Sequence, residues 1–475
     1  MTPEKHRCLR TTITILLAFF FSCDYLAAQT QTALKVLTLE SAVNYALKNY
    51  PRVRVALEQA LAAQGGVSLA KMAYLPRADM LWQGNRATRN NIFGLLLPQT
   101  VISPVSGPVL PTASNDSVWG SAAGVLVSWE PFDFGRRRAD VGVARSAENL
   151  AQSDLSVTRL NVAAAVASAF LTACAAQQKA AAAQADVERR QVFANAVHVL
   201  VKNDLRPGAD ASRADAELAR AQVLLIEAQQ AEAVSRATLA QVLGIAGTTV
   251  QIEPGILNSN PPESDPPAPP VTAHPLATAE QARVDEIKSQ ERLLDRSYFP
   301  RFNLQSTIYA RGSGANTDGT IQTGTGGLGL DRSDWAAGLT VTFPALEIFS
   351  IRSRKQIAVA NERAERAQYD QTLNDLTGQV QQAQATLEGA RLVARKTPIE
   401  LQAARETEMQ SRARYEAGLA NIIEVADAQG LLAQAETDDA LARLAVWNDL
   451  AVLAAAQGDL QPFFQMVHEK TQGGP

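Results

Sequence analysis

The sequence has little charge and few aromatic side chains. Charged residues make up 19% of the 475 residues and aromatic residues 6%, and the net charge is −4. This balance argues against a nucleic-acid-binding protein, which needs a basic surface. An apolar content of 46% excludes a chain that is disordered throughout. The mean hydropathy of −0.08 excludes a helical multi-pass membrane protein, and the abundant alanine suits closely packed helices.

Motifs that carry catalysis, metal binding or nucleotide binding are missing from the sequence. The four histidines do not cluster at the spacing of metal ligands, and no Walker phosphate loop or Gly-x-Ser-x-Gly nucleophile motif occurs. Residues 324–329 fit Gly-x-Gly-x-x-Gly, but they lie between two expected strands and open no helix. The sequence therefore predicts a protein that is not an enzyme and needs no cofactor or metal.

Cysteine is also scarce, and two of the three cysteines lie in the N-terminal segment. Of the three cysteines, Cys174 alone lies in the expected mature protein, so no internal disulfide can form. Its alanine-rich surroundings predict a small buried helix residue.

The N-terminus is typical of a secretory signal. Basic residues come first, an apolar run follows from Thr11 to Phe21, and Leu26-Ala-Ala28 offers a cleavage site. The apolar run is too short to span a bilayer. Cleavage before Cys23 is the alternative, and it would leave a lipid anchor on the Cys23 thiol.

The remaining chain is an internal duplication. Tyr74-Leu-Pro-Arg77 recurs as Tyr298-Phe-Pro-Arg301, and the segment 207–215 recurs as 417–424. The order of expected elements is the same in both halves, which indicates a structural repeat. The predicted division is a signal peptide (1–28), a first repeat (29–257), a Pro-rich linker (258–274), a second repeat (275–460) and a C-terminal tail (461–475).

The sequence predicts two strands in each half, at 78–86 and 118–129 in the first and at 302–311 and 335–343 in the second. Apolar and polar residues alternate along them; Trp335, Leu339 and Phe343 fall on one face. Their length of about 9–11 residues fits a transmembrane β-barrel, and a soluble sheet with one buried face is the alternative. Four strands cannot close a useful barrel, so a barrel requires several chains. Aromatic girdles would place four tryptophans at the membrane interface: Trp82, Trp119, Trp129 and Trp335.

Long helices dominate both halves. The first helical stretch spans 39–73 with a break at Pro51. Segments 136–205 and 351–415, the latter with a kink expected at Pro398, predict helices of about 100 Å. Such lengths belong to coiled coils or tubes, and the return helices show near-heptad spacing built largely on alanine. A soluble coiled coil is the alternative on this evidence alone.

The turns between the long helices and their return helices predict two defined hairpin tips. Gly208 and Gly418 are expected to supply the left-handed residue after each incoming helix. Ser212-Arg-Ala-Asp215 and Asn421-Ile-Ile-Glu424 resemble capping boxes, in which the first side chain caps free amides and the acid reaches back.

Together these motifs resemble the TolC-type outer-membrane efflux proteins over nearly the whole mature chain. The carriers are the duplication, the Tyr-x-Pro-Arg entry into each first strand, the Trp129–Arg138 exit into a long helix and the segment Tyr415–Asp427. The resemblance implies a homotrimer with a shared twelve-stranded barrel and a twelve-helix tunnel. It also implies a passive duct in the outer membrane that works with a periplasmic adaptor and an inner-membrane transporter. Drugs, metals, small organic molecules or secreted proteins are all compatible cargo.

The resemblance also implies a gated periplasmic entrance. Glu424 and Asp427 match positions that ring the family's entrance with carboxylates, which favours cations. Their alternative roles are a helix cap and a favourable interaction with the helix dipole. Tyr415 matches a residue that helps to hold the entrance shut, but Ala420 stands where the family's partner arginine is expected. Tip residues expected to contact the adaptor are Gly208, Ser212, Asp215, Gly418 and Asn421.

A periplasmic adaptor is the competing function, because adaptors also carry long helical hairpins. An adaptor predicts one hairpin together with lipoyl-like and barrel modules. Two equivalent hairpins and four tryptophan-marked strands favour the duct. The expected fold is therefore mostly helical, with antiparallel hairpins and four strands for a membrane barrel.

Overall fold

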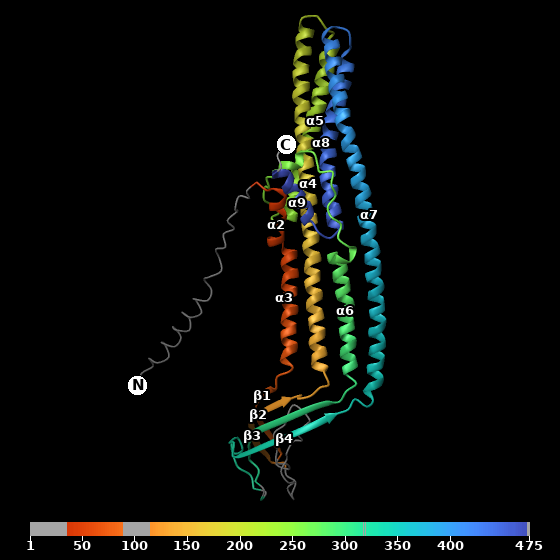
Figure 1. Cartoon of the computed structure of the whole chain (residues 1–475). Helices are drawn as coiled ribbons and strands as arrows, with labels where there is room; N and C mark the ends of the chain where they lie inside the picture. Colours follow the sequence, from red (N-terminus) through yellow and green to blue (C-terminus); the bar gives the residue numbers. More distant parts are fainter. Residues whose placement is uncertain (1–35, 89–114, 317, 319, 473–475) are drawn as a thin grey trace, which may run out of the picture.

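The protein is a long bundle of helices that carries a β-sheet at one end (Figure 1). The computed structural model describes residues 36–88, 115–316, 318 and 320–472, so the predicted signal peptide and Cys23 lie outside the described residues. In chain order the elements are α2 (Leu39–Asn49), α3 (Pro51–Met72), β1 (Arg77–Thr88), β2 (Ser117–Trp129), α4 (Arg136–Lys202), α5 (Gly208–Val242), the 3-10 helices η1 (Gly255–Asn258) and η2 (Val271–Ala273), α6 (Pro275–Arg296), β3 (Arg301–Ser313), β4 (Arg332–Thr342), α7 (Glu347–Glu416), α8 (Ile422–Ala456) and α9 (Gln461–Gln472).

The order of helix, two strands, long helix and return helix occurs twice, which confirms the predicted duplication. Corresponding helices begin alike: Pro51 opens α3 and Pro275 opens α6. Proline suits this position because its fixed φ fits a helix and its missing N–H has no intrahelical partner there. The predicted break at Pro51 is thus the boundary between α2 and α3.

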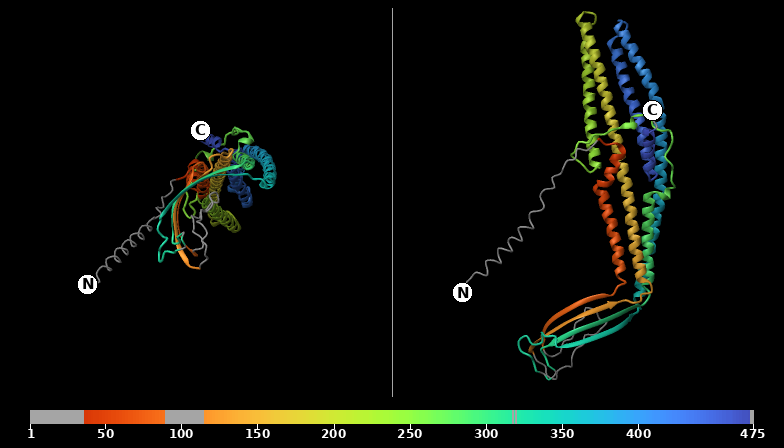
Figure 2. Two further views of the ribbon diagram at one scale, coloured as in Figure 1. Left: turned by 90° about the horizontal axis from the view of Figure 1, so that it is seen from below. Right: turned by 60° about the vertical axis from the view of Figure 1, so that its left-hand side comes forward.

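Two helical hairpins form the body of the molecule. α4 has 67 residues and α7 has 70, and each turns back into a 35-residue helix, α5 or α8. At 1.5 Å per residue α4 is about 100 Å long, and it runs from the sheet to the hairpin tips (Figure 1). α7 continues through Pro398 as a single helix. Toward their tips the hairpins form two separate pairs, α4–α5 and α7–α8 (Figure 2).

The near-heptad spacing of the return helices matches the side chains that they bury. Small and branched residues at these positions let the helices approach closely. In α8 the predicted series is buried throughout: Val425, Ala428, Leu432, Ala435, Ala442 and Val446.

The main hydrophobic core lies midway along the bundle, where the ends of both repeats meet. The rings of Trp447 in α8 and Phe463 in α9 lie 6.3 Å apart, and both are fully buried. The Trp447 indole N–H donates to the Ser259 carbonyl oxygen over 3.3 Å. Further along the same connecting segment, the Arg391 guanidinium bonds to the Asp265 carboxylate at 2.6 Å. The segment between the repeats is therefore fixed across α7 and α8.

One stretch of α4 is apolar and long enough to cross a membrane, judged by length and composition. However, 44% of that stretch is buried within the bundle. Phe170 and Cys174 belong to the main core and have no exposed surface. Burial also raises the pKa of the Cys174 thiol to about 12. This part of α4 is a core helix, and Cys174 is the buried small residue that the sequence predicts.

The sheet has the order β1-β2-β3-β4, and each neighbouring pair is antiparallel. Its register aligns apolar side chains across all four strands, so that Met80, Val125, Ile308 and Trp335 form one row. Met80 is 89% exposed and Trp335 77%. On β4 and just beyond it, every residue of the predicted apolar face is exposed: Trp335, Ala337, Leu339, Val341 and Phe343. A large apolar face turned outward is typical of contact with lipid or another protein.

Candidate functional site

The two hairpin tips share one turn geometry. The N–H of Leu205 donates to the Leu200 carbonyl oxygen at 2.9 Å, and that of Leu419 donates to the Arg414 carbonyl oxygen at 2.8 Å. These are the six-to-one bonds of a Schellman motif, which needs a left-handed residue just before the donor. In the second hairpin that residue is Gly418, with φ of +77°, as predicted.

In the first hairpin the left-handed residue is Asp204, with φ of +57°, and the assignment to Gly208 is wrong. Aspartate tolerates this conformation better than most residues with a side chain. Pro207 disfavours helix in the residue before it, so α4 ends early and α5 begins directly after Pro207, at Gly208.

The capping-box prediction for Ser212–Asp215 is also wrong, because both residues lie inside α5. Ser212 is exposed, and the Asp215 carboxylate lies 2.8 Å from Nε2 of His198 in α4. The acidic residue in the first turn of α5 is Asp210, not the predicted Asp215.

The cap of α8 is half of the predicted box. Oδ1 of Asn421 accepts a hydrogen bond from the backbone N–H of Glu424 at 3.0 Å. The Glu424 carboxylate does not return to the cap; it lies 3.8 Å from the Arg414 guanidinium, with both side chains about half exposed. Such an exposed pair contributes little stability. Asp427 follows one turn later and is also exposed, so both carboxylates face solvent in the single chain.

Tyr415 joins the two tips. It is 1% exposed and packs against Phe193 of α4, with 5.6 Å between the ring centroids. Its hydroxyl donates to the Asp210 carboxylate of α5 at 2.9 Å. Burial, followed by this bond to an anion, raises the pKa of Tyr415 to about 12. The phenol therefore stays neutral and keeps its donor at physiological pH.

An arginine also engages Tyr415, but it comes from the other hairpin. The Arg206 guanidinium lies over the tyrosine ring, 4.2 Å from its centroid, and donates to the Tyr415 carbonyl oxygen. Position 420, where the resemblance leads one to expect the arginine, is a partly buried alanine packed beside this cluster. Tyr415 thus has an arginine partner in this chain, but that partner is Arg206, between α4 and α5, and not a residue at position 420.

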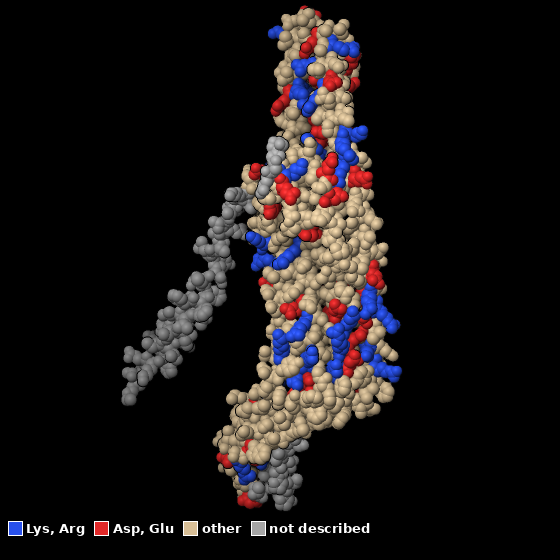
Figure 3. All heavy atoms as spheres, in the orientation of Figure 1, with Lys and Arg blue, Asp and Glu red and all other residues tan. Residues whose placement is uncertain are grey.

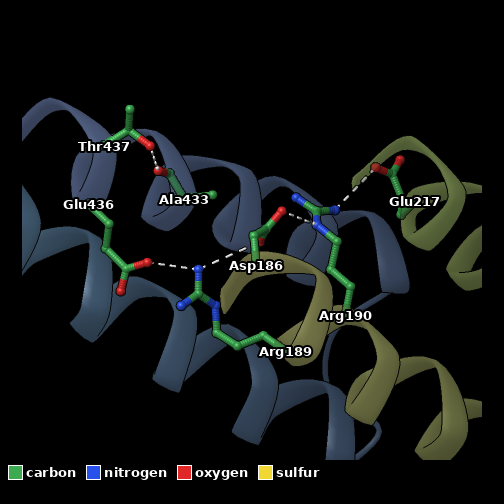
Figure 4. A network of polar contacts seen from close by, with 7 residues as sticks. All are labelled: Asp186, Arg189, Arg190, Glu217, Ala433, Glu436 and Thr437. Carbon is green, nitrogen blue, oxygen red and sulfur yellow. Dashed lines mark hydrogen bonds and ion pairs between the residues drawn. The ribbon is translucent and has the colours of Figure 1, made fainter. Parts of the chain in front are cut away.

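Further from the tips, a network of charged side chains ties α4 to both return helices (Figure 4). Arg190 of α4 donates to Asp186 at 2.8 Å and to Glu217 of α5 at 3.3 Å. The neighbouring Arg189 pairs with Glu436 of α8 at 2.8 Å. Asp186 and Arg190 are both less than 10% exposed. Each buried charge also has a second, more distant partner, Glu217 for Arg190 at 3.3 Å and Arg189 for Asp186 at 3.6 Å, so removal of either residue would leave the other less well compensated.

A cavity of about 640 Å³ lies beside this network, between the two hairpins. Its lining is rich in charge of both signs and includes Arg190, Glu217 and, nearer the tip, Asp427. No group of three histidine, cysteine or carboxylate side chains in the described segments is arranged to hold a metal ion.

The four predicted interface tryptophans all lie on the sheet. Trp82 and Trp335 are 77% exposed. Trp129 is 39% exposed and its indole N–H donates to the Tyr74 carbonyl oxygen at 3.2 Å. Trp119 is partly buried, under the Arg86 guanidinium.

Comparison with known proteins identifies the architecture. The sequence matches the outer membrane efflux protein family over residues 42–245 and 273–459, which is more than half of the chain. This chain belongs to the outer membrane efflux protein family. It is also similar to protein CyaE of Bordetella pertussis, with 26% identity over 429 residues that cover 89% of this chain and 84% of CyaE.

Solved outer-membrane channels share the fold of this efflux protein. OprN has 18% identity and a TM-score of 0.67, and the match covers 88% of this chain and 89% of OprN. CmeC of Campylobacter jejuni has 15% identity and a TM-score of 0.70, covering 92% of this chain and 90% of CmeC. The open state of MtrE of Neisseria gonorrhoeae has 18% identity and a TM-score of 0.70, covering 89% of each chain.

The efflux protein is therefore an outer-membrane exit duct that extends into the periplasm. These matches favour the duct over the alternative function of a periplasmic adaptor. Its family and fold are those of channels, not enzymes. Members of this family are trimeric channels that work with an adaptor and an inner-membrane transporter.

Sequence reasoning missed two residues at the tips, Arg206 and Asp210. Asp210 carried a usable signal, since an acid in the first turn after Pro207 is typical of a helix start. Arg206 carried none, because its partner Tyr415 lies 209 residues away.

Proposed function

We propose that three copies of this efflux protein surround a periplasmic entrance formed by their hairpin tips, and that Tyr415 holds this entrance closed. The observation that carries the proposal is the Tyr415 cluster, which bonds the α7–α8 tip to the α4–α5 tip of the same chain. Separation of the tips requires loss of the Tyr415–Asp210 bond and of the Arg206 stacking. A buried bond to a charged group is worth about 1.5–3 kcal/mol, which suits a latch that a partner can release.

Glu424 and Asp427 form the selectivity element of the proposed entrance. They lie three residues apart in the first turns of α8, so they share a helix face, and both are exposed. Three copies would bring six carboxylates to one axis, which favours cations and repels anions.

The tips are the proposed contact for a periplasmic adaptor. Leu205 is 68% exposed and Leu419 is 72% exposed, and each directly follows the left-handed residue of its tip. Two equivalent exposed leucines offer an adaptor the same apolar contact on both hairpins. Beside them lie the predicted contact residues Gly208, Ser212, Asp215, Gly418 and Asn421, all of them exposed.

The sheet is the proposed membrane part. Three chains would supply twelve strands with the Met80–Trp335 row facing lipid, and the four tryptophans would meet the membrane interface. Cleavage of residues 1–28 would precede assembly, with lipidation of Cys23 as the alternative N-terminus.

Conductance in planar bilayers tests the entrance. Glu424→Ala with Asp427→Ala should lower cation preference and weaken block by multivalent cations. A control pair, Asp370→Ala with Glu388→Ala, removes the same charge from exposed positions of α7 far from the tip. Unchanged ion selectivity and unchanged block in the tip variant would refute the assignment of Glu424 and Asp427 to the gate. An equal change in the tip variant and the control variant would indicate a general charge effect.

A further inference from the structure

A basic motif repeats where each long helix leaves the sheet. α4 begins with Arg136-Arg137-Arg138, and α7 carries Arg352-Ser353-Arg354-Lys355 in its second and third turns. These residues lie at the end of the bundle opposite the tips, so the proposed entrance does not explain them.

Helix stability does not account for the motif. The N-terminal end of a helix carries a partial positive charge, so cations there are unfavourable. No acidic residue lies in the first turn of α4, and the Asp133 carboxylate just before it is bound to the backbone N–H and the guanidinium of Arg137. In α7 only Glu347 precedes the basic residues.

Ion pairing within the chain accounts for two of the cations. Arg137 donates to the Asp133 carboxylate at 2.8 Å and lies over the Tyr74 ring. Lys355 pairs with Asp295 at 2.5 Å. The other four side chains form no hydrogen bond or ion pair with the described residues: Arg136, Arg138, Arg352 and Arg354. Arg136 is partly buried, and the other three are exposed.

Each basic motif directly follows exposed apolar side chains. Phe132, before α4, is 54% exposed. Before and within the first turn of α7, Phe343 is 69% exposed, Leu346 83% and Phe349 70%. Figure 3 shows the same boundary on one face of the molecule, where Lys and Arg side chains, with Asp and Glu among them, lie over the lower helix ends and the adjoining sheet surface is uncharged up to its far end. A step from an apolar belt to a basic belt is the pattern of a membrane–water interface.

A groove of about 660 Å³ lies on the α7 side of this belt. Tyr298, at the end of α6, lines it together with Arg352, Lys355 and Arg363 of α7, and Ile348 and Val359 supply apolar walls. Arg352 and Arg363, which form no ion pair with the described residues, lie beside aliphatic side chains there and match a ligand that joins an anionic headgroup to acyl chains. The Asp295 carboxylate nearby is already paired with Lys355.

We propose that Arg136, Arg138, Arg352 and Arg354 bind the phosphate headgroups of anionic phospholipids at the periplasmic surface of the outer membrane. This inference rests on the proposed membrane position of the sheet. Guanidinium groups bind phosphate oxygens through paired hydrogen bonds, and each basic residue near an anionic membrane surface adds to the attraction. The duplication places one such pair on each repeat, so the lipid contact surrounds the barrel of the proposed trimer.

Native mass spectrometry of the full mature chain in detergent tests the proposal, with short-chain phosphatidylglycerol, phosphatidylcholine and inorganic phosphate as separate probes. The wild type should bind phosphatidylglycerol more tightly than phosphatidylcholine, with an affinity that falls as salt rises. Conversion of all four arginines to Gln should weaken phosphatidylglycerol binding by tenfold or more. The half variants, Arg136→Gln with Arg138→Gln and Arg352→Gln with Arg354→Gln, should each show part of this loss.

A matched control removes four exposed arginines that form no ion pair in the described chain and lie away from the junction, through Gln substitutions at Arg52, Arg54, Arg395 and Arg405. Its affinity for phosphatidylglycerol should equal that of the wild type. Equal loss in the control, unchanged binding in the four-residue variant, or full competition by inorganic phosphate would each overturn the lipid assignment. A wild-type protein that forms no trimers, or that shows no conductance in bilayers, would instead refute the proposed function.

Discussion

The Tyr415 cluster makes a sharp prediction about gating. Tyr415→Phe removes only the hydroxyl that bonds to Asp210, while the ring keeps its packing against Phe193 and its place under Arg206. A hydrogen bond to a charged acceptor in a buried site contributes about 1.5–3 kcal/mol. At 1.4 kcal/mol per factor of ten, the ratio of closed to open channels should fall by roughly 10- to 150-fold.

Single-channel recording in planar bilayers measures that ratio as open probability. Tyr369→Phe is the control, because it makes the same change on the same helix at a hydroxyl for which the structure shows no hydrogen bond. Asp210→Ala should raise open probability as well, and the double variant should add little to either single change. An open probability of Tyr415→Phe equal to that of the wild type would refute the latch.

The direction of the Tyr415 pKa adds a pH dependence to the same assay. The phenol titrates near 10 in an unfolded chain and at about 12 in the closed cluster. A pKa raised in this way gives stability that is present below pH 10 and is lost as the pH rises toward 12. The latch should therefore hold at neutral pH, and its contribution should decline only in strong alkali.

Two further predictions concern stability, measured as the thermal midpoint of the detergent-solubilised protein by circular dichroism. Gly418→Ala should cost about 1 kcal/mol or more because φ is +77°, whereas Gly208→Ala should be neutral or stabilising by up to about 1 kcal/mol, since a methyl group there meets nothing within 4 Å; equal losses would contradict the assigned turn. Asp186→Ala leaves the buried Arg190 with the more distant Glu217 carboxylate, at 3.3 Å, and should cost about 1–3 kcal/mol. Asp438→Ala, whose carboxylate accepts from the exposed Gln434, should cost under about 1 kcal/mol, and a similar loss in both variants would argue against a special role of the network.

The sequence predicted the parts of the fold that depend on local pattern. Alternation in 335–343 identified β4 and its exposed face, and the spacing from Val425 to Val446 identified the buried side of α8. Pro51 marked a true helix boundary because its missing N–H suits a first helical position.

The tips show where such reasoning stops. The pattern predicts a glycine as the left-handed residue in both turns, but in the first turn Asp204 adopts that conformation, since Pro207 sets the start of α5. The contact between Tyr415 and Asp210 joins residues 205 positions apart, on different hairpins. No periodicity within either helix encodes that pairing, because it depends on how the two hairpins pack.

The placement of the main core has a mechanical consequence for the far end of the bundle. Trp447 and Phe463 anchor α8 midway along the molecule, whereas its first residue, Ile422, lies 25 residues away at the tip. A helix segment of that length rises about 38 Å, so a pivot of roughly 10° at Trp447 swings its tip by some 6–7 Å. If α8 pivots at this anchored aromatic pair, a small rotation there would become a displacement at the tip as wide as a hydrated ion.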